Sequence, residues 1–287
     1  MDALYLIELF CHIDDFWKNF KPKWEQHQVI NRSRKHWWST RDPALSSSEI
    51  MTICVYFHLS KYRTFKDYYL YEIKGRCLKY FPKAVSYHRF VKLMKKVIFP
   101  LFTMQKSFEG KESGIAFIDS TILSVCHIAR ASSHKVFKKQ ASKGKTTTGW
   151  FFGLKLHLVI NEQGEILSWM ITPGNTSDIK PVENLTAKLK GKLIGDKGYI
   201  SKKLLDKLRA RGLHLITKIR SNMKNKLMEM WDKMLLKKRG VIESVINRLK
   251  FGCHIQHHRH RCPINFFINL VAGLTAYSMC HKKPSLV

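Results

Sequence analysis

The chain has 287 residues, and its 51 Lys and Arg against 21 Asp and Glu give a formal net charge of +30. This charge excludes an acidic enzyme and an ordinary neutral metabolic enzyme, and it favours a polyanionic partner, with nucleic acid ahead of a membrane surface. Because 45% of the residues are hydrophobic and 12% are aromatic, the chain can bury a core and is not a disordered basic tail.

The N-terminus does not have the pattern of a signal peptide. Asp2, Glu8, Asp14 and Asp15 stand where a basic region and an uninterrupted apolar run would be needed. The longest apolar stretch, residues 264–280, is interrupted by polar side chains and is shorter than the roughly 20 residues that a membrane-spanning helix needs. The 7 cysteines have no regular spacing, which favours free thiols. We therefore expect a cytoplasmic protein without a membrane partner, with residues 264–280 as a buried helix.

The first hundred residues are predicted to be helical. Ser46 and Glu49 form a capping box (S-x-x-E) ahead of an apolar run with helical spacing. Two further helices are expected near residues 64–73 and 86–97, the second of which ends before Pro100.

Short helices of this kind suit a helix-turn-helix-like, DNA-binding region over residues 1–108. An alternative that the pattern leaves open is a helical domain with a solvated basic face. The basic residues that decorate these helices are Lys61, Arg63, Lys66, Arg89, Lys92, Lys95 and Lys96.

A polar, glycine-bearing linker at residues 105–114 precedes a change from helical to strand-like patterns. The expected strands span residues 115–118, 122–126, 150–160, 165–172, 193–194 and 214–219, with a hairpin turn at 161–164. The expected helices are one capped by Ser177 or Asp178 and running to Leu189, one at 201–211, and two later segments. Hairpin strands followed by alternating strands and helices predict an α/β or α+β domain with a mixed sheet.

Two of the scarce acidic residues follow short apolar strands. Asp119 and Asp196 each stand at the predicted carboxyl end of a strand, the end at which open α/β sheets bind ligands. If the two strands are neighbours, the carboxylates repel each other and favour a hard divalent cation between them. The alternative is that both residues cap turns.

A third acidic residue stands on a helix with an apolar face. In RGVIESVINRLK a second stripe at helical spacing contains Arg239, Glu243 and Lys250, beside the apolar positions. On this second stripe, Glu243 is expected to stand where the helix meets the sheet. Arg239 and Lys250 could then hold phosphates while Glu243 holds a metal ion. The alternative is an exposed i, i+4 pair between Glu243 and Arg239.

With these three carboxylates in place, the surrounding sequence resembles DDE-type insertion-sequence transposases, in particular those of the insertion sequence 982 group. The resemblance covers nearly the whole chain. Broader relatives carry a Tyr-Arg-Glu-Lys signature with two, three and six residues between its members. Arg239, Glu243 and Lys250 keep the last two spacings, whereas Leu236 stands at the tyrosine position. The runs that carry the resemblance are LSSSEIMTICVYFHLSKYRTFKDYY, SYHRFVKLM, HKVFKKQASKGKTTTGWFFGLKLHLVIN, TPGNTSD, GKLIGDKGYIS, KKRGVIESVINRLK and HHRHRCPINFFINLVAGLTAY.

The resemblance implies a ribonuclease-H-like catalytic domain over residues 109–287, flanked by helices and following the helical region. It implies that Asp119, Asp196 and Glu243 are catalytic and hold two divalent ions, Mg²⁺ with Mn²⁺ as a substitute. Water then cleaves DNA at the terminal inverted repeats of the element, and the freed 3′-hydroxyl attacks target DNA. The implied partners are double-stranded DNA, as element ends and target, and a second copy of the chain on DNA.

The basic excess predicts where DNA is held. From Lys188 to Arg261 there are 21 basic and 5 acidic residues, a local excess of 16. The expected DNA contacts are Lys135, Lys138 and Lys143 of the segment 129–149, together with Lys197, Arg239 and Lys250. The alternatives are a mobile basic loop for that segment and a solvated side chain for Lys197. For the whole protein, a basic nucleic-acid-binding protein without catalysis and a ribonuclease-H-like nuclease without strand transfer also stay open.

Overall fold

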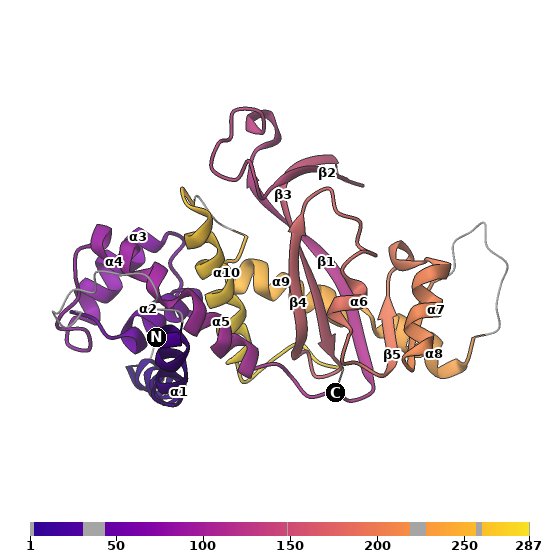
Figure 1. The fold of residues 1–287 in the computed structure, drawn as a ribbon, viewed down its shortest axis with the longest axis horizontal. Helices are drawn as coiled ribbons and strands as arrows, with labels where there is room; N and C mark the ends of the chain where they lie inside the picture. Colours follow the sequence, from indigo (N-terminus) through magenta and orange to yellow (C-terminus); the bar gives the residue numbers. More distant parts are fainter. Residues whose placement is uncertain (1–2, 31–43, 148, 219–227, 257–259, 287) are drawn as a thin grey trace. The chain divides into compact units, whose positions relative to one another are not determined.

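The computed structural model describes residues 3–30, 44–147, 149–218, 228–256 and 260–286. The chain forms two compact units, Met1–Ser107 with Gly252–Tyr277 and Phe108–Phe251 with Ser278–Val287 (Figure 1). The segment 252–277 thus packs with the N-terminal helices, a grouping that helical periodicity does not reveal. The predicted division of roles between residues 1–108 and 109–287 stays a prediction.

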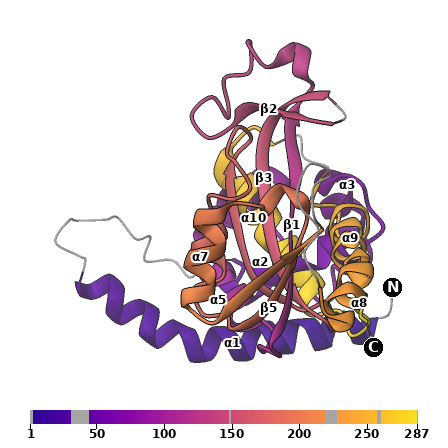
Figure 2. The same cartoon turned by 90° about the vertical axis from the view of Figure 1, so that its right-hand side faces the viewer.

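The first unit is helical, as predicted. Ser46 Oγ accepts the Glu49 N–H at 3.1 Å while the Glu49 carboxylate accepts the Ser46 N–H at 2.7 Å, so the predicted capping box is confirmed. Figure 2 shows the first helix as a long indigo rod. The helices of this unit are α1 (Ala3–Ile30), α2 (Ser47–Leu59), α3 (Phe65–Asp67), the π-helix Tyr68–Arg76, α4 (Tyr87–Met94), the 3₁₀ turn Lys95–Val97, α5 (Ile98–Ser107) and α10 (Pro263–Ser278).

The predicted helix near residues 86–97 is confirmed as α4 and the 3₁₀ turn after it, which end before Pro100, but the sequence analysis missed the next helix, α5. Pro100 lies in the first turn of α5, where the missing N–H has no intrahelical partner in any case. The predicted linker accordingly begins after Ser107 instead of at Gln105. Helix α10 is buried along most of its length, as predicted. No helix in the described ranges is long and apolar enough to cross a membrane.

The second unit is built on a six-stranded mixed sheet with the order β2-β3-β1-β5-β6, in which β4 also pairs with β3. The pairs β1–β3, β2–β3 and β3–β4 are antiparallel, whereas β1–β5 and β5–β6 are parallel. The mixed sheet that the sequence predicts is therefore confirmed. The strands are β1 (Ile115–Cys126), β2 (Ser142–Thr146), β3 (Gly149–Asn161), β4 (Ile166–Pro173), β5 (Gly191–Gly195) and β6 (Leu213–Thr217).

Two strand predictions need correction. β1 is one continuous strand with Asp119 inside it, because β3 pairs with it from Ala116 to Cys126 and bridges the polar residues after Ile118. β2 is a strand that the sequence analysis missed, since SKGKT has little intrinsic preference for extended structure and β3 supplies its pairing. The hairpin between β3 and β4 is confirmed: the Asn161 side-chain oxygen accepts the N–H groups of Gln163 and Glu165.

Helices cover both faces of this sheet. Figure 2 shows α7 on one side of the strands and α8 and α9 on the other. The predicted helix at Ser201 is confirmed, with the Ser201 side chain capping α7. The predicted helix that starts at Ser177 or Asp178 is reduced to the single turn α6, and neither residue is its N-cap. The helices are α6 (Val182–Leu185), α7 (Lys202–Ala210), α8 (Met230–Lys238) and α9 (Gly240–Asn247), with the 3₁₀ turns Ile128–Arg130 and Lys197–Tyr199 and the π-helix Arg248–Gly252.

Candidate active site on the mixed sheet

Asp119 lies in β1, and Asp196 directly follows β5, the adjacent parallel strand. The ladder of β1 and β5 runs from Ile115 opposite Lys192 to Phe117 opposite Ile194. Continuing this register by two residues sets Asp119 beside Asp196, on strands that are typically about 4.8 Å apart. The predicted neighbourhood of the two strands is therefore confirmed. Asp196 follows the end of β5 and is exposed, whereas Asp119 is partly buried because β1 continues along β3.

Arg239 links Asp119 to Glu243. Its Nη1 lies 3.5 Å from Asp119 Oδ2, and its Nη2 lies 2.7 Å from Glu243 Oε1. The Arg239 side chain is only 19% exposed, so the guanidinium is largely withdrawn from solvent between the two carboxylates. The i, i+4 pair that the sequence suggested as an alternative is present, and the same arginine also reaches the sheet. Carboxylates from β1 and from α9, far apart in the sequence, are thereby joined.

The surroundings of Asp119 raise the pKa of its carboxyl from 3.8 to about 6. Burial is the main cause, and the Asp196 and Glu243 carboxylates add to it through like-charge repulsion. The Ser120 N–H, which donates to Asp119 Oδ1 at 2.8 Å, and the Arg239 guanidinium act in the opposite direction. The Asp196 and Glu243 carboxylates are therefore close enough to Asp119 to raise the pKa of its carboxyl.

The donor chemistry of this site suits a hard divalent cation, since carboxylate oxygens are the ligands that Mg²⁺ prefers. A cation would also neutralise the mutual repulsion that raises the pKa of Asp119. Within the described residues, however, no group of three or more His, Cys, Asp or Glu side chains is close enough to hold a metal ion together. The positive group between Asp119 and Glu243 in this structure is Arg239.

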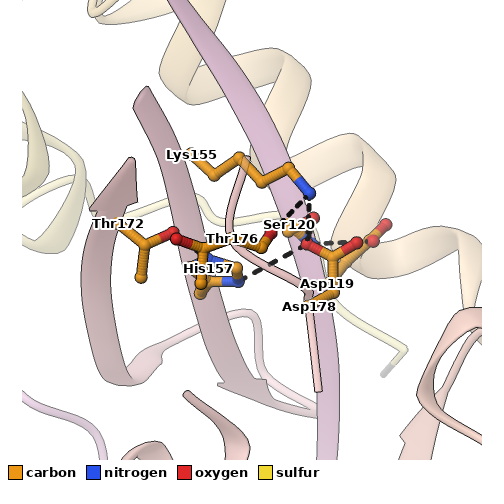
Figure 3. Close-up of polar contacts among 7 residues, drawn as sticks. All are labelled: Asp119, Ser120, Lys155, His157, Thr172, Thr176 and Asp178. Carbon is orange, nitrogen blue, oxygen red and sulfur yellow. Dashed lines mark hydrogen bonds and ion pairs between the residues drawn. The ribbon is translucent and has the colours of Figure 1, made fainter. Parts of the chain in front are cut away.

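A polar network lies behind Asp119, centred on Asp178 (Figure 3). Ser120 Oγ donates to Asp178 Oδ1 at 2.9 Å, and Lys155 Nζ donates to the same oxygen at 3.1 Å. Lys155 also donates to the Thr176 carbonyl oxygen at 3.0 Å. Because Ser120 directly follows Asp119, these contacts tie the strand that carries Asp119 to β3 and to the turn after β4.

His157 completes the network from β3. It stands opposite Ser120 in the β1–β3 ladder, and its Nδ1 lies 3.9 Å from Asp178 Oδ1. Its Nε2 forms a 2.8 Å hydrogen bond with Thr172 Oγ1. Burial, with a contribution from Lys155, lowers the pKa of His157 to about 4, although Asp178 opposes this. The imidazole is therefore neutral at physiological pH.

Sequence reasoning missed this network. The signal was present in LKLHLVIN, where Lys155 and His157 are two residues apart in an otherwise apolar strand and must share one face. Asp178, expected as a helix cap, instead accepts hydrogen bonds from Ser120 and Lys155. Tyr199 also belongs to this region: burial and the nearby Asp119 carboxylate raise the pKa of its phenol, which stays protonated.

The sequence model of the family described as Transposase DDE domain matches residues 109–263, which is 155 of the 287 residues. The chain belongs to the DDE transposase family. This family consists of enzymes that hydrolyse phosphodiesters and transfer DNA strands, so membership implies activity in DNA transposition. No curated protein matches the chain.

Solved structures of transposases resemble this DDE transposase in fold. The piggyBac transposase in a synaptic complex with hairpin DNA has a TM-score of 0.50 and 11% identity, covering 97% of this chain and 74% of that chain. The Mos1 strand transfer complex has a TM-score of 0.25 and 12% identity, covering 83% of both chains. At these identities the piggyBac likeness shows the fold alone, and the Mos1 likeness is too weak to carry an argument. The predicted ribonuclease-H-like mixed sheet with flanking helices is confirmed.

The other predicted site residues of the transposase lie around the sheet. Lys197 is exposed directly after Asp196, and Lys250 is half-buried in the π-helix after α9, where burial lowers its pKa. Lys143 is exposed on β2, where it pairs with Phe152 of β3. Phe152 is six residues along β3 from Leu158, the partner of Asp119, so Lys143 lies about 20 Å from Asp119 along the strands. Lys135 and Lys138 are exposed in the preceding loop. Leu236, at the signature tyrosine position, is buried in α8.

Proposed function

We propose that this chain is the transposase of an insertion sequence of the 982 group, which binds terminal inverted repeats and catalyses metal-dependent cleavage and strand transfer. The observation that carries the proposal is the arrangement of two carboxylates along β1 and β5 and a third on α9, linked to Asp119 by Arg239. Asp119 and Asp196 share the β1–β5 register, and Arg239 joins Asp119 to Glu243. All three acidic residues fall inside the segment that matches the DDE transposase family.

Asp119, Asp196 and Glu243 would hold two divalent ions, Mg²⁺ or, as a substitute, Mn²⁺. Ions bound there supply the charge that activates the attacking oxygen and stabilises the leaving oxygen of a phosphoryl transfer. The task of the chain is to present ionised carboxylates at fixed positions. The Ser120 N–H favours the ionised form of Asp119 and orients its Oδ1, while Asp178 anchors the Ser120 hydroxyl on the other side of the strand.

Arg239 has two roles in this proposal. Without cations it supplies the positive charge between Asp119 and Glu243, which limits the rise of the Asp119 pKa. When the carboxylates serve as ligands, its guanidinium is released to a DNA phosphate, which it suits because its fork of donors can bind two oxygens at once. Lys197, next to Asp196, and Lys250, beyond Glu243, are the other basic residues proposed to hold the substrate backbone.

Double-stranded DNA, as element ends and as target, is the proposed partner, bound by at least two copies of the chain. Basic residues of both units would hold it. Lys135, Lys138 and Lys143 are proposed to contact DNA that extends beyond the carboxylates along the sheet. The helix-turn-helix-like region would bind the inverted repeats through its exposed basic residues Lys61, Arg63, Lys66, Arg89, Lys92, Lys95 and Lys96.

The test follows the products of the reaction. The full chain, with Mg²⁺, is given a duplex that ends in the inverted repeat and a supercoiled target plasmid. The proposed function predicts nicks at the repeat end and repeat DNA joined covalently to the plasmid. Nicks without joined products would indicate a nuclease of the same fold. Repeat binding without nicks in Mg²⁺ or Mn²⁺, over a range of salt concentrations, would indicate a binding protein. Either result would overturn the proposal.

A further inference from the structure

One end of the sheet carries a segment without negative charge. Between Asp119 and Glu162 the sequence has no acidic residue and seven Lys or Arg. We call residues 127–147 and 149–151 the basic arm: the loop after β1, strand β2 and the start of β3. Figures 1 and 2 both show it at one end of the sheet, away from α6, α7 and α8. The exposed lysines of the basic arm are Lys135, Lys138, Lys139, Lys143 and Lys145.

Aromatic packing and a close backbone contact hold the basic arm on the sheet. Phe137 is buried, and His134 stacks on it with ring centroids 5.9 Å apart while also meeting the edge of Phe152. At Gly144 of β2 a Cβ atom would clash with the Gly174 carbonyl oxygen, so only glycine lets the two backbones approach so closely. The lysines of the arm are thus presented by a packed structure.

Trp150 is the exposed aromatic side chain of this surface. Its side chain is 60% exposed, although it stands in a strand whose following residues are buried. Lys145 is its partner in the β2–β3 ladder, and Lys145 Nζ lies 5.6 Å from the centre of the Trp150 ring. The indole is therefore a flat apolar surface among positive charges. These charges repel a basic protein surface, whereas a polyanion that carries flat apolar groups suits both the charges and the indole.

Nucleic acid with unpaired bases has this combination of groups. Lysines bind its phosphates without regard to sequence, and an aromatic ring stacks on any base that offers a free face. In the interior of a duplex both faces of each base are already stacked on neighbouring base pairs, so away from the duplex ends an indole gains a stacking partner only from an unpaired base. Stacking on Trp150 would therefore favour single-stranded DNA over the interior of a duplex.

We propose that Trp150 stacks on an unpaired DNA base while the lysines of the basic arm hold the adjoining phosphates. This inference rests on the proposed function, which brings DNA to the same sheet. Trp150 lies eight residues along β3 from Leu158, the partner of Asp119, which corresponds to about 25 Å. The stacked base would thus lie about seven nucleotides from the phosphate at the carboxylates where the DNA between them is duplex.

The test measures binding of the full chain to a fluorescently labelled 20-nucleotide single strand and to its duplex, in EDTA and without any repeat sequence. We expect Trp150→Ala to weaken single-strand binding about tenfold and duplex binding less than twofold. Trp150→Phe keeps an aromatic face and is expected to restore most of the affinity. Trp231→Ala removes another exposed tryptophan, on α8, and serves as the matched control that leaves both affinities unchanged.

Three results would overturn the inference: equal weakening of single-strand and duplex binding by Trp150→Ala, no weakening by it, or the same loss in Trp231→Ala. The assay needs neither metal nor cleavage. Asp119→Asn is therefore expected to keep the Trp150-dependent preference for single strands. If the chain fails to cleave and join DNA but keeps this preference, the proposed function fails and the stacking surface stands. If the chain cleaves and joins DNA but lacks this preference, the proposed function stands and only the stacking inference is overturned.

Discussion

Asp119 and Asp196 occupy equivalent positions on neighbouring parallel strands, each two residues beyond the last residue of the β1–β5 ladder. Their carboxylates therefore share one end of that ladder although 77 positions separate their numbers in the sequence. Burial raises the pKa of Asp119, and the Asp196 and Glu243 carboxylates raise it further through like-charge repulsion.

Asp119 should make the stability of the metal-free protein depend on pH. The folded state raises its pKa from 3.8 to about 6, so between these values the folded chain keeps a proton that the unfolded chain has lost. Stability therefore falls as pH rises from about 4 to about 6 and then levels off. The shift corresponds to at most about 3 kcal/mol. Urea unfolding in EDTA at several pH values, with Asp119→Asn as reference, checks this, and parallel pH curves for the two proteins would contradict it.

Replacing Arg239 should shift the pH dependence of DNA cleavage. The guanidinium lowers the pKa of Asp119, so Arg239→Gln leaves that pKa higher and moves the acidic limb of the cleavage profile to higher pH. Arg239→Lys keeps the charge and is expected to restore the position of the limb in part. Single-turnover cleavage rates, measured from about pH 5 to about pH 9 at intervals of about half a pH unit, give the shift. An unchanged limb in Arg239→Gln would contradict an effect of Arg239 on the ionisation of Asp119 during cleavage.

The Asp178 network should stabilise the fold. Lys155 is only 13% exposed, and Asp178→Ala would leave its ammonium and the Ser120 hydroxyl without their common acceptor. We expect the free energy of unfolding to fall by about 2 kcal/mol, because a largely buried charge loses its partner. Chemical denaturation at neutral pH measures the loss.

Glu183→Gln is the matched control for Asp178→Ala. Glu183 also pairs with a lysine, Lys207, at 2.8 Å, but both side chains are exposed, and exposed ion pairs contribute little to stability. Equal losses in the two variants would show that the network around Asp178 acts as an ordinary surface pair.

DNA binding should weaken steeply with salt, because lysines that neutralise phosphates release counterions. Replacing Lys135, Lys138 and Lys143 together by Gln is expected to reduce the slope of log affinity against log salt by about 3, or about one for each phosphate contact. Anisotropy titrations at a series of NaCl concentrations measure the slope. Replacing three exposed lysines of α7, Lys202, Lys203 and Lys207, is the charge-matched control, and an equal change there would contradict a specific role for the basic arm.

Much of the fold could be predicted from local patterns, since caps and periodicities act within a few residues. The capping box at Ser46 and the helix after Ser201 are examples. The errors come from long-range pairing. The polar residues after Ile118 look like the end of a strand, yet β3 pairs with them and keeps β1 continuous.

The candidate site shows the same limit. The three carboxylates could be selected because acidic residues are scarce in a chain with a net charge of +30. Their connection through Arg239 could be predicted only as far as the i, i+4 pair with Glu243, since its contact with Asp119 depends on how α9 packs on β1. Asp178 has the spacing of a helix cap in TPGNTSD, and its role in bonding Ser120 appears only when the strands are assembled.

The most direct measurement is cleavage of a terminal-repeat duplex by Asp119→Asn, Asp196→Asn and Glu243→Gln, each in Mg²⁺ and alongside a binding titration. Asp206→Asn, an exposed carboxylate on α7, is the control. If the three carboxylates form one site, each of their substitutions lowers the cleavage rate by about a thousandfold or more while repeat binding stays within about twofold. Substantial cleavage by any one of these three variants, at a rate near that of Asp206→Asn, would contradict the assignment of that residue to the active site.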